Sequence, residues 1–196
     1  TGGVGGIDQQ RFLLGRHKEK GGALAIAQHG GWGYGMCKSF PAMASIEYRI
    51  ADYFLSWGWS SHSNYKVNVA PLPSPLLSKT VRSKNASSEI ILVGSQVRLT
   101  GDRIASRIQT EQSQEYRREK INFVRSLDRE NSKHLLYRPY FSEIDSFPER
   151  SLLRENFPKL KYLESNFHKK LMRAKCVIID APGTTIDIAL SADIPT

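Results

Sequence analysis

Short apolar runs that alternate with segments of helical character constrain the fold of this chain more than any other feature. We predict strands in these runs and in one aromatic-rich run, at residues 23–27, 52–57, 89–93, 134–138 and 176–180. Helical spacing or capping signals predict helices around residues 46–50, 116–127, 160–171 and 184–192. Strands that alternate with helices form parallel sheets through right-handed crossovers. The sequence therefore predicts the α/β class.

Two segments lack such patterns. Residues 1–22 are rich in glycine and then basic, and we expect a loop there. Pro71, Pro73 and Pro75 alternate and are followed by mostly polar residues up to Ser88. Alternating prolines cannot continue a helix or a central strand, so this stretch is interpreted as a domain linker or crossing loop.

The charge of the chain favours anionic partners. With 28 Lys and Arg against 19 Asp and Glu, the net charge is +9. This excess suits nucleic acid, phosphorylated small molecules or an acidic membrane surface, without choosing among them. No apolar run reaches the roughly 18 residues of a transmembrane helix. The two cysteines, Cys37 and Cys176, exclude a disulfide scaffold and a four-cysteine zinc site, and we expect Cys176 to be a buried thiol.

Ligands of open α/β sheets bind outside the carboxyl ends of the strands, and three strand ends here are informative. The first leads into the glycine-rich residues 28–35. The imidazole of His29 can take a proton from an attacking hydroxyl. Gly30, Gly31 and Gly33 let a substrate approach the backbone closely. The alternative is a histidine whose ring only satisfies backbone groups in a tight loop.

The second strand end leads into a predicted helix start at residues 180–187. Thr184 is the expected N-cap, with Asp187 three positions later as in a capping box. The free N–H groups of a helix start attract anions, and the hydroxyls of Thr184 and Thr185 could add donors to a phosphate. The alternative is an ordinary capped helix.

The third strand end is Arg138, whose guanidinium could clamp a phosphate with two hydrogen bonds. The alternative for Arg138 is a surface ion pair. The histidines and cysteines show no metal-ligand spacing, so we expect no metal site.

Two longer patterns resemble known families. Residues 28–35 read QHGGWGYG and residues 52–59 read DYFLSWGW. Together they resemble a family of bacterial surface-carbohydrate-biosynthesis transferases. Residues 179–196, which begin IDAPGTTIDIAL, resemble the donor-site segment of glycosyltransferases with the GT-B fold. The resemblance covers most of residues 23–196.

The resemblance implies two Rossmann-like halves with parallel sheets, arranged as in GT-B enzymes. Residues 1–75 would be the end of an acceptor-side domain, residues 76–88 a linker, and residues 89–196 a truncated domain that binds the donor nucleotide. Because the chain begins without Met in a glycine-rich stretch, we expect a fragment in which both halves are incomplete.

The resemblance further implies a metal-independent glycosyltransferase that moves a sugar from a nucleotide-activated donor during surface polysaccharide biosynthesis. His29 would be catalytic, in a cleft shaped by Gly30, Gly31 and Gly33. The residues expected to bind the donor phosphates are Arg138, Gly183, Thr184, Thr185 and Asp187.

The same resemblance sets the expected partners and location. The donor is a substrate, so no separate cofactor is expected, and the acceptor would be a carbohydrate or a lipid-linked molecule. We expect a cytoplasmic protein that contacts the inner membrane surface peripherally and binds no nucleic acid. Two alternatives stay open: a nucleotide-sugar epimerase of the same fold, and a non-catalytic nucleic-acid-binding α/β module, which the positive charge favours.

Overall fold

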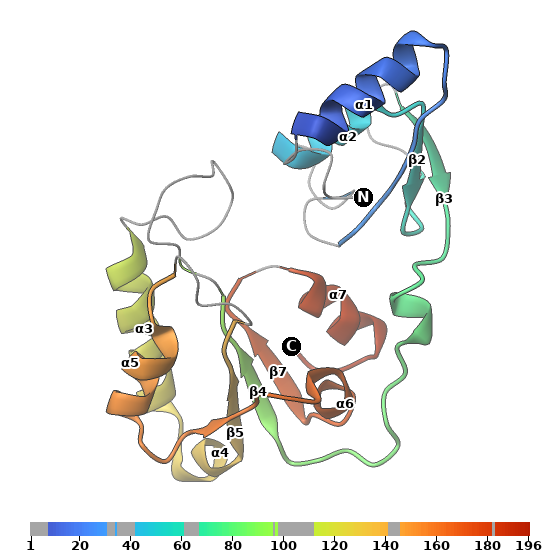
Figure 1. Cartoon of the computed structure of the whole chain (residues 1–196). Coiled ribbons are helices and arrows are strands. Elements are labelled where there is room, and N and C mark those ends of the chain that lie inside the picture. Colours follow the sequence, from blue (N-terminus) through green and yellow to red (C-terminus); the bar gives the residue numbers. More distant parts are fainter. Residues whose placement is uncertain are drawn as a thin grey trace. The chain divides into compact units, whose positions relative to one another are not determined.

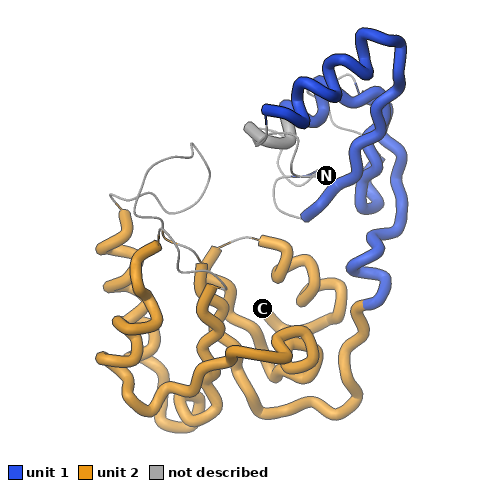
Figure 2. The backbone as a smooth tube through the Cα atoms, viewed as in Figure 1, with its two compact units in different colours: residues 1–79 blue, residues 80–196 orange. Residues whose placement is uncertain are grey.

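The computed structural model describes residues 8–30, 34, 42–60, 67–95, 97, 112–140, 146–181 and 183–196. The chain divides into two compact units, Thr1–Lys79 and Thr80–Thr196 (Figure 2). Each unit contains a sheet of parallel strands with helices packed on it (Figure 1). The predicted α/β class, with two Rossmann-like parallel sheets, is therefore confirmed.

Unit 1 is built on a three-stranded sheet of order β1-β2-β3. Its strands are β1 (Ala25–Ala27), β2 (Tyr53–Ser56) and β3 (Asn68–Pro71), and both pairings are parallel. Helix α2 (Ala42–Ile50) connects β1 to β2, and the 3-10 turn η1 (Leu77–Lys79) follows β3. The predicted linker thus begins within a strand. Pro71 pairs with Ser56 as the last residue of β3, an edge position where proline costs no ladder hydrogen bond.

The prediction of a loop over residues 1–22 is wrong for residues 8–19, because α1 spans Asp8–Glu19, and residues 1–7 lie outside the described residues. Asp8 lies in its first turn, and Arg16 and Lys18 lie in its last turn, where each charge complements the helix dipole. The apolar residues of α1, Phe12, Leu13 and Leu14, are consecutive, so the sequence shows no apolar stripe at helical spacing, and no residue of α1 is buried.

The core of unit 1 is aromatic. Ile26 from β1, Tyr48 from α2 and Phe54 from β2 are almost fully buried in one cluster. Tyr34 completes the cluster, and Trp59 packs against it with its ring centroid 5.5 Å from that of Phe54. Trp59 is therefore held by core packing and by its hydrogen bond to Gln28, which fixes the loop after β2 on the loop after β1.

Unit 2 is built on a four-stranded sheet of order β6-β5-β4-β7, in which every pairing is parallel. The strands are β4 (Ile90–Val93), β5 (Leu135–Arg138), β6 (Lys161–Tyr162) and β7 (Cys176–Ile179). The helices are α3 (Ser113–Ser126), α4 (Arg129–His134), α5 (Glu149–Asn156), α6 (Phe167–Leu171) and α7 (Thr184–Ser191).

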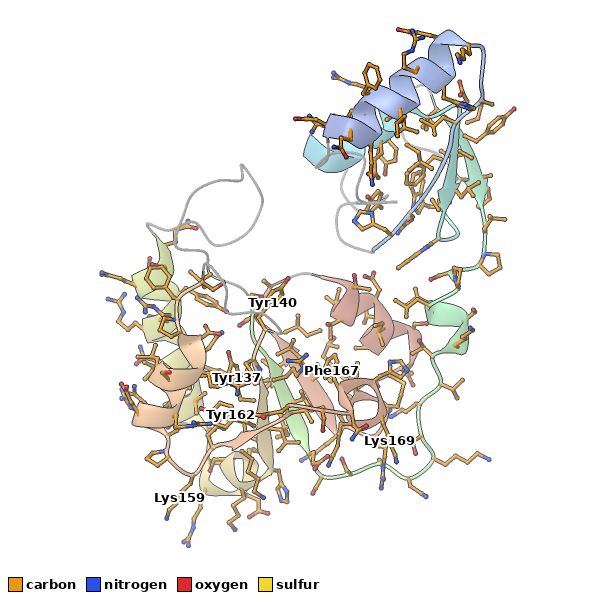
Figure 3. All side chains as sticks on the ribbon, viewed as in Figure 1. Tyr137, Tyr140, Lys159, Tyr162, Phe167 and Lys169 are labelled. Atoms are coloured by element: carbon orange, nitrogen blue, oxygen red, sulfur yellow. The ribbon has the colours of Figure 1, made fainter. Side chains whose placement is uncertain are left out.

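Both faces of this sheet are covered, as expected for a parallel sheet. On one face, Ile91 and Val177 pack in a cluster with Leu171 of α6 and Ala189 of α7. On the other face, Leu92, Leu135 and Tyr137 pack with Val124 of α3 and Leu153 of α5. Tyr137 (Figure 3) therefore lies between the sheet and the α3–α5 pair.

The predicted helix over residues 160–171 is wrong in its first half. Lys161 and Tyr162 form β6, and only α6 is helical. Asn166 interrupts the segment in the left-handed conformation, with φ of 55°. Leu163 and Leu171 nevertheless share one core cluster, because the strand end and the helix face the same side of the sheet. The helical spacing of the apolar residues in this stretch therefore comes from a strand end and a separate helix.

Cys176 is half-buried and free, and its burial raises the pKa of the thiol. No helix in the described ranges is long and apolar enough to cross a membrane.

Candidate functional site

The loop that follows β1 is anchored on both sides of His29. The side chain of Gln28 is buried, and its Nε2 donates to the carbonyl oxygen of Gly30 at 2.8 Å. Its Oε1 accepts from the backbone N–H of Trp57 and from Nε1 of Trp59, both at 2.9 Å. One amide therefore fixes the loop after β1 to the loop after β2. His29 itself is exposed between its two buried neighbours, which presents the ring to solvent.

A chain of hydrogen bonds runs from His29 into the core of unit 1. Nδ1 of His29 lies 2.6 Å from the hydroxyl oxygen of Tyr34, and this hydroxyl donates to Oε2 of Glu47 at 2.6 Å. The Glu47 side chain comes from α2 and is 1% exposed. Its second oxygen, Oε1, is buried and has no hydrogen-bond partner among the described residues.

The electrostatics of this chain keep the Tyr34 hydroxyl protonated. Burial raises the pKa of Tyr34 far above its ordinary value, and its hydrogen bond to Glu47 and the Glu47 charge raise that pKa further. A protonated hydroxyl can donate to Glu47 and accept from His29 at the same time.

In unit 2, the strand register brings the carboxyl ends of three strands together. Val93 pairs with Arg138 of β5 on one side and with Ile179 of β7 on the other. Asp180 follows β7 directly, and Ser95 after β4 donates to its Oδ1 at 2.8 Å. This edge is where ligands of open α/β sheets bind.

A buried ionic network lies behind this edge. Lys120 of α3 has its Nζ 2.7 Å from Oε1 of Glu149 and 2.7 Å from Oδ2 of Asp180. Tyr116 also donates to Oδ2 of Asp180, and Tyr137 donates to Oε2 of Glu149. Burial and the two carboxylates raise the pKa of both tyrosines well above the ordinary range. One cation and two tyrosine hydroxyls thus hold one buried and one partly buried carboxylate.

The start of α7 differs from the prediction. Gly183 is the N-cap, in extended conformation, and no side chain caps the helix, so the expected N-cap role of Thr184 is wrong. Thr184 and Thr185 are the first two helical residues, and both are half-buried. Asp187 does not complete a capping box: its Oδ2 is buried without a partner among the described residues, and burial raises its pKa.

Arg138 lies half-buried at the end of β5. Its Nη1 donates to the carbonyl oxygen of Pro139, and its guanidinium carbon lies 5.4 Å from the ring centroid of Phe167. Within the described ranges Arg138 forms no ion pair, so the surface ion pair weighed as its alternative is not observed. The other N–H groups of its guanidinium form no hydrogen bond with the described residues.

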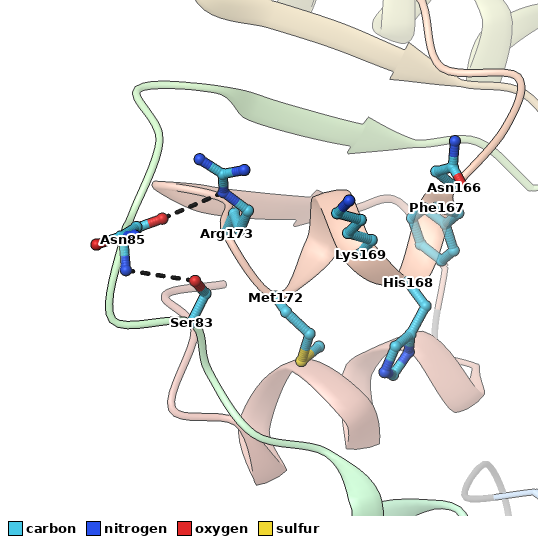
Figure 4. A pocket seen from close by; sticks show the side chains of 8 residues that line it. All are labelled: Ser83, Asn85, Asn166, Phe167, His168, Lys169, Met172 and Arg173. Atoms are coloured by element: carbon cyan, nitrogen blue, oxygen red, sulfur yellow. Dashed lines mark hydrogen bonds between the residues drawn. The ribbon is translucent and has the colours of Figure 1, made fainter.

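A separate pocket of about 760 Å³ lies elsewhere in unit 2 (Figure 4). Its lining residues are Ser83, Asn85, Asn166, Phe167, His168, Lys169, Met172 and Arg173. Asn85 accepts from Nε of Arg173 at 3.3 Å. None of the residues predicted to be functional lines this pocket, and the segments at residues 83–85 and 172–173 lead into the amino ends of β4 and β7.

The comparison with protein families gives a match over residues 6–196, to a family described as LIC12162 family transferase. The chain belongs to the LIC12162 family of transferases. Among curated proteins, no sequence matches it. Transferases move a chemical group from a donor to an acceptor molecule, so the reaction class of this chain is group transfer.

The structure distributes the predicted residues of this LIC12162 family transferase over its two units. His29 and Gly30 lie in unit 1, whereas Gly31 and Gly33 fall outside the described residues. Arg138 and the α7 start, with Gly183, Thr184, Thr185 and Asp187, lie in unit 2. No group of three or more potential metal ligands occurs in the described part of the transferase.

Sequence reasoning missed the side chains that hold the predicted ones in place. Tyr34 follows His29 across a glycine-rich loop and Glu47 lies on α2, whereas Lys120 stands in a run of alternating charges that is typical of a solvated helix face. The signal available for Glu47 was its position between apolar residues of a short helix. For Lys120, apolar residues one and four positions later, Ile121 and Val124, marked the same part of α3 as packed.

Proposed function

We propose that this transferase moves a sugar from a nucleotide-activated donor to a hydroxyl of a carbohydrate or lipid-linked acceptor. The observation that carries the proposal is the start of α7 at the carboxyl edge of the parallel sheet of unit 2. The first N–H groups of a helix have no partner within it and point outward with the positive end of the helix dipole. Such a start binds phosphate.

Side chains at this edge add to the attraction for a diphosphate. Thr184 and Thr185 carry hydroxyls in the first turn of α7, and Arg138 ends a strand of the same sheet. When the bond between the sugar and the phosphate breaks, negative charge grows on the leaving phosphate oxygen. Fixed donors and a guanidinium stabilise that charge, which is the main electrostatic task in such a transfer.

His29 supplies the complementary function in the proposed reaction. The acceptor oxygen forms a bond to the anomeric carbon, the bond from that carbon to the phosphate oxygen breaks, and the nucleotide leaves with the electron pair. The proton of the acceptor hydroxyl passes to the imidazole of His29, which acts as general base. No metal ion is required by this scheme. The positive charge of the chain suits an anionic donor and an acceptor at the inner membrane surface.

Calorimetric titration of nucleosides, nucleoside monophosphates and nucleoside diphosphates tests the donor site. We expect a diphosphate to bind and the double variant Thr184→Val, Thr185→Val to weaken it by about tenfold or more, since a hydrogen bond to a charged group contributes about 1.5–3 kcal/mol. Binding of the bare nucleoside should change little. Ser191→Ala, at the other end of α7, is the matched control.

Equal weakening of nucleoside and diphosphate would contradict a phosphate-binding role for the two threonines. If none of the ligands binds the unmodified chain, the nucleotide donor itself is excluded. Product analysis then separates sugar transfer from epimerisation, because only transfer joins the sugar to an acceptor.

A further inference from the structure

We propose that Tyr34 and Glu47 are positioning residues that fix the tautomer of His29, with the proton on Nδ1 and the basic lone pair on Nε2. The inference rests on the proposed function, because it assigns the reacting atom of the proposed base.

The hydrogen-bond directions determine this tautomer. Tyr34 has one hydroxyl proton, and it is directed to Oε2 of Glu47 at 2.6 Å. The oxygen of Tyr34 can then only accept from Nδ1 of His29, which lies 2.6 Å away. A neutral imidazole carries a single N–H, so Nε2 is left with its lone pair.

The side chains become more exposed from Glu47 through Tyr34 to His29, so the lone pair on Nε2 of His29 lies at the solvent end of the hydrogen-bond chain. Glu47 is 1% exposed and Tyr34 is 5% exposed, whereas His29 is exposed. Nε2 has no hydrogen-bond partner among the described residues, and the imidazole is free to meet a substrate hydroxyl there. The neighbouring loop is held on both sides of the ring by Gln28, so the ring does not have to be ordered when substrate binds.

The packing around Tyr34 fixes the direction of its hydroxyl. Its ring stacks on Phe54 with centroids 5.6 Å apart and planes 20° apart. The ring of His29 meets Tyr34 edge-on, at 5.2 Å and 86°. A tyrosine held between a buried aromatic ring and the imidazole keeps one hydrogen-bond geometry, as a positioning group must.

Glu47 supplies the charge for the proton transfer. Burying a carboxylate is costly when its oxygens are not all paired, and one oxygen of Glu47 has no partner among the described residues. That cost is offset when Nε2 takes the acceptor proton, because the imidazolium then faces a carboxylate through the Tyr34 hydroxyl. The logic is that of a base oriented by a buried acid, with a tyrosine inserted between them.

Nitrogen-15 NMR of the full chain tests the tautomer without substrate. We expect a protonated, pyrrole-type Nδ1 and an unprotonated, pyridine-type Nε2 for His29, with its signals assigned by their loss in His29→Gln. Tyr34→Phe keeps the ring packing and removes the hydroxyl, so His29 should revert to the Nε2–H tautomer that histidine prefers in water. In Glu47→Gln the amide oxygen can still accept from Tyr34, so the tautomer should persist.

The kinetic readout is a fall in kcat with unchanged KM in both variants, by about 10–100-fold, as for other groups that orient an imidazole. Tyr53→Phe is the control, since Tyr53 is 50% exposed on β2 and should alter neither the tautomer nor kcat. An Nε2–H tautomer in the unmodified chain, or no change of tautomer in Tyr34→Phe, overturns the inference. If the tautomer behaves as expected but no nucleotide sugar is turned over, the positioning role of Tyr34 and Glu47 is supported and the proposed sugar transfer is contradicted.

Discussion

Lys120 and Asp180 meet at 2.7 Å between Nζ and Oδ2, although α3 and the end of β7 are far apart in the sequence. The two side chains are 4% and 14% exposed. Because Asp180 leads into the residues before α7, this contact ties the position of the proposed phosphate-binding segment to a helix on the opposite face of the sheet.

Replacing Lys120 by Met should destabilise the chain strongly. The substitution leaves the buried Glu149 and the partly buried Asp180 without their cation, and breaking a buried ion pair in this way costs about 3–5 kcal/mol. Urea unfolding of the full chain measures the change. Arg118→Met is the matched control, since Arg118 lies on the same helix with its side chain 66% exposed. If both variants unfold at the same urea concentration, the network contributes nothing to stability.

Gly94→Ala should destabilise unit 2. A Cβ at Gly94 would overlap the Tyr137 hydroxyl and lie 3.0 Å from Oε2 of Glu149, and overpacking of this kind costs about 1–3 kcal/mol. Gly15→Ala is the reverse control: nothing lies within 4 Å of a Cβ there, and Gly15 is inside α1. Alanine should stabilise that helix by about 0.5–1 kcal/mol. Thermal melts compare the two, and a neutral Gly94→Ala would show that Tyr137 can move aside.

Asp52→Asn should lower the melting temperature of the chain in a pH-dependent way. The hydrogen bond from Lys18 at 2.6 Å and that from the Leu24 N–H at 2.7 Å hold the pKa of Asp52 below its ordinary value of 3.8. A lowered folded-state pKa contributes stability above the unfolded value and loses it as pH falls through the folded value. The difference between the two proteins should therefore be largest near neutrality, shrink as the pH falls below 3.8 and vanish only below the lower folded-state pKa. A difference that stays constant across this range would assign the effect to packing.

His29→Ala should abolish most turnover and leave nucleotide binding intact. Loss of general-base catalysis costs about 10²–10⁴ in rate. Steady-state kinetics and calorimetry measure the two quantities separately. His168→Ala, an exposed histidine of α6, is the control and should retain turnover. Lost nucleotide affinity in His29→Ala would place the imidazole with the donor instead of the acceptor.

Five strands could be predicted from the sequence, because short apolar or aromatic runs bounded by polar residues favour strands, whereas β3 and β6 were not predicted. β4, β5 and β7 lie within one or two residues of the predicted limits. α1 could not be predicted, since its apolar residues are consecutive and form no stripe at helical spacing. A single helix was wrongly predicted over residues 160–171, because a strand end and a helix place apolar residues in one core cluster at helical spacing.

Candidate site residues could be proposed from the sequence only where polar residues follow a strand directly. His29, Arg138 and Thr184 stand at strand ends or a helix start, and their functional roles stay predictions. The charged sequence neighbours of Lys120 favour solvent exposure, yet the side chain is buried. Its burial depends on Glu149 and Asp180, which only tertiary structure brings to it. The proposed roles of Glu47 and Tyr34 likewise depend on a hydrogen-bond chain to His29 that only the tertiary structure forms.

The order β6-β5-β4-β7 has a consequence for folding during synthesis. β4 gains its neighbour β5 early, but its other edge stays open until β7 has emerged from the ribosome. During that interval Ile91 lacks Val177 and Ala189, which cover it in the finished structure. The three strands of unit 1, in contrast, are all available once Pro71 is made. Nascent chains should therefore depend on chaperones mainly while residues 94–179 are being added, since open strand edges and uncovered apolar faces aggregate.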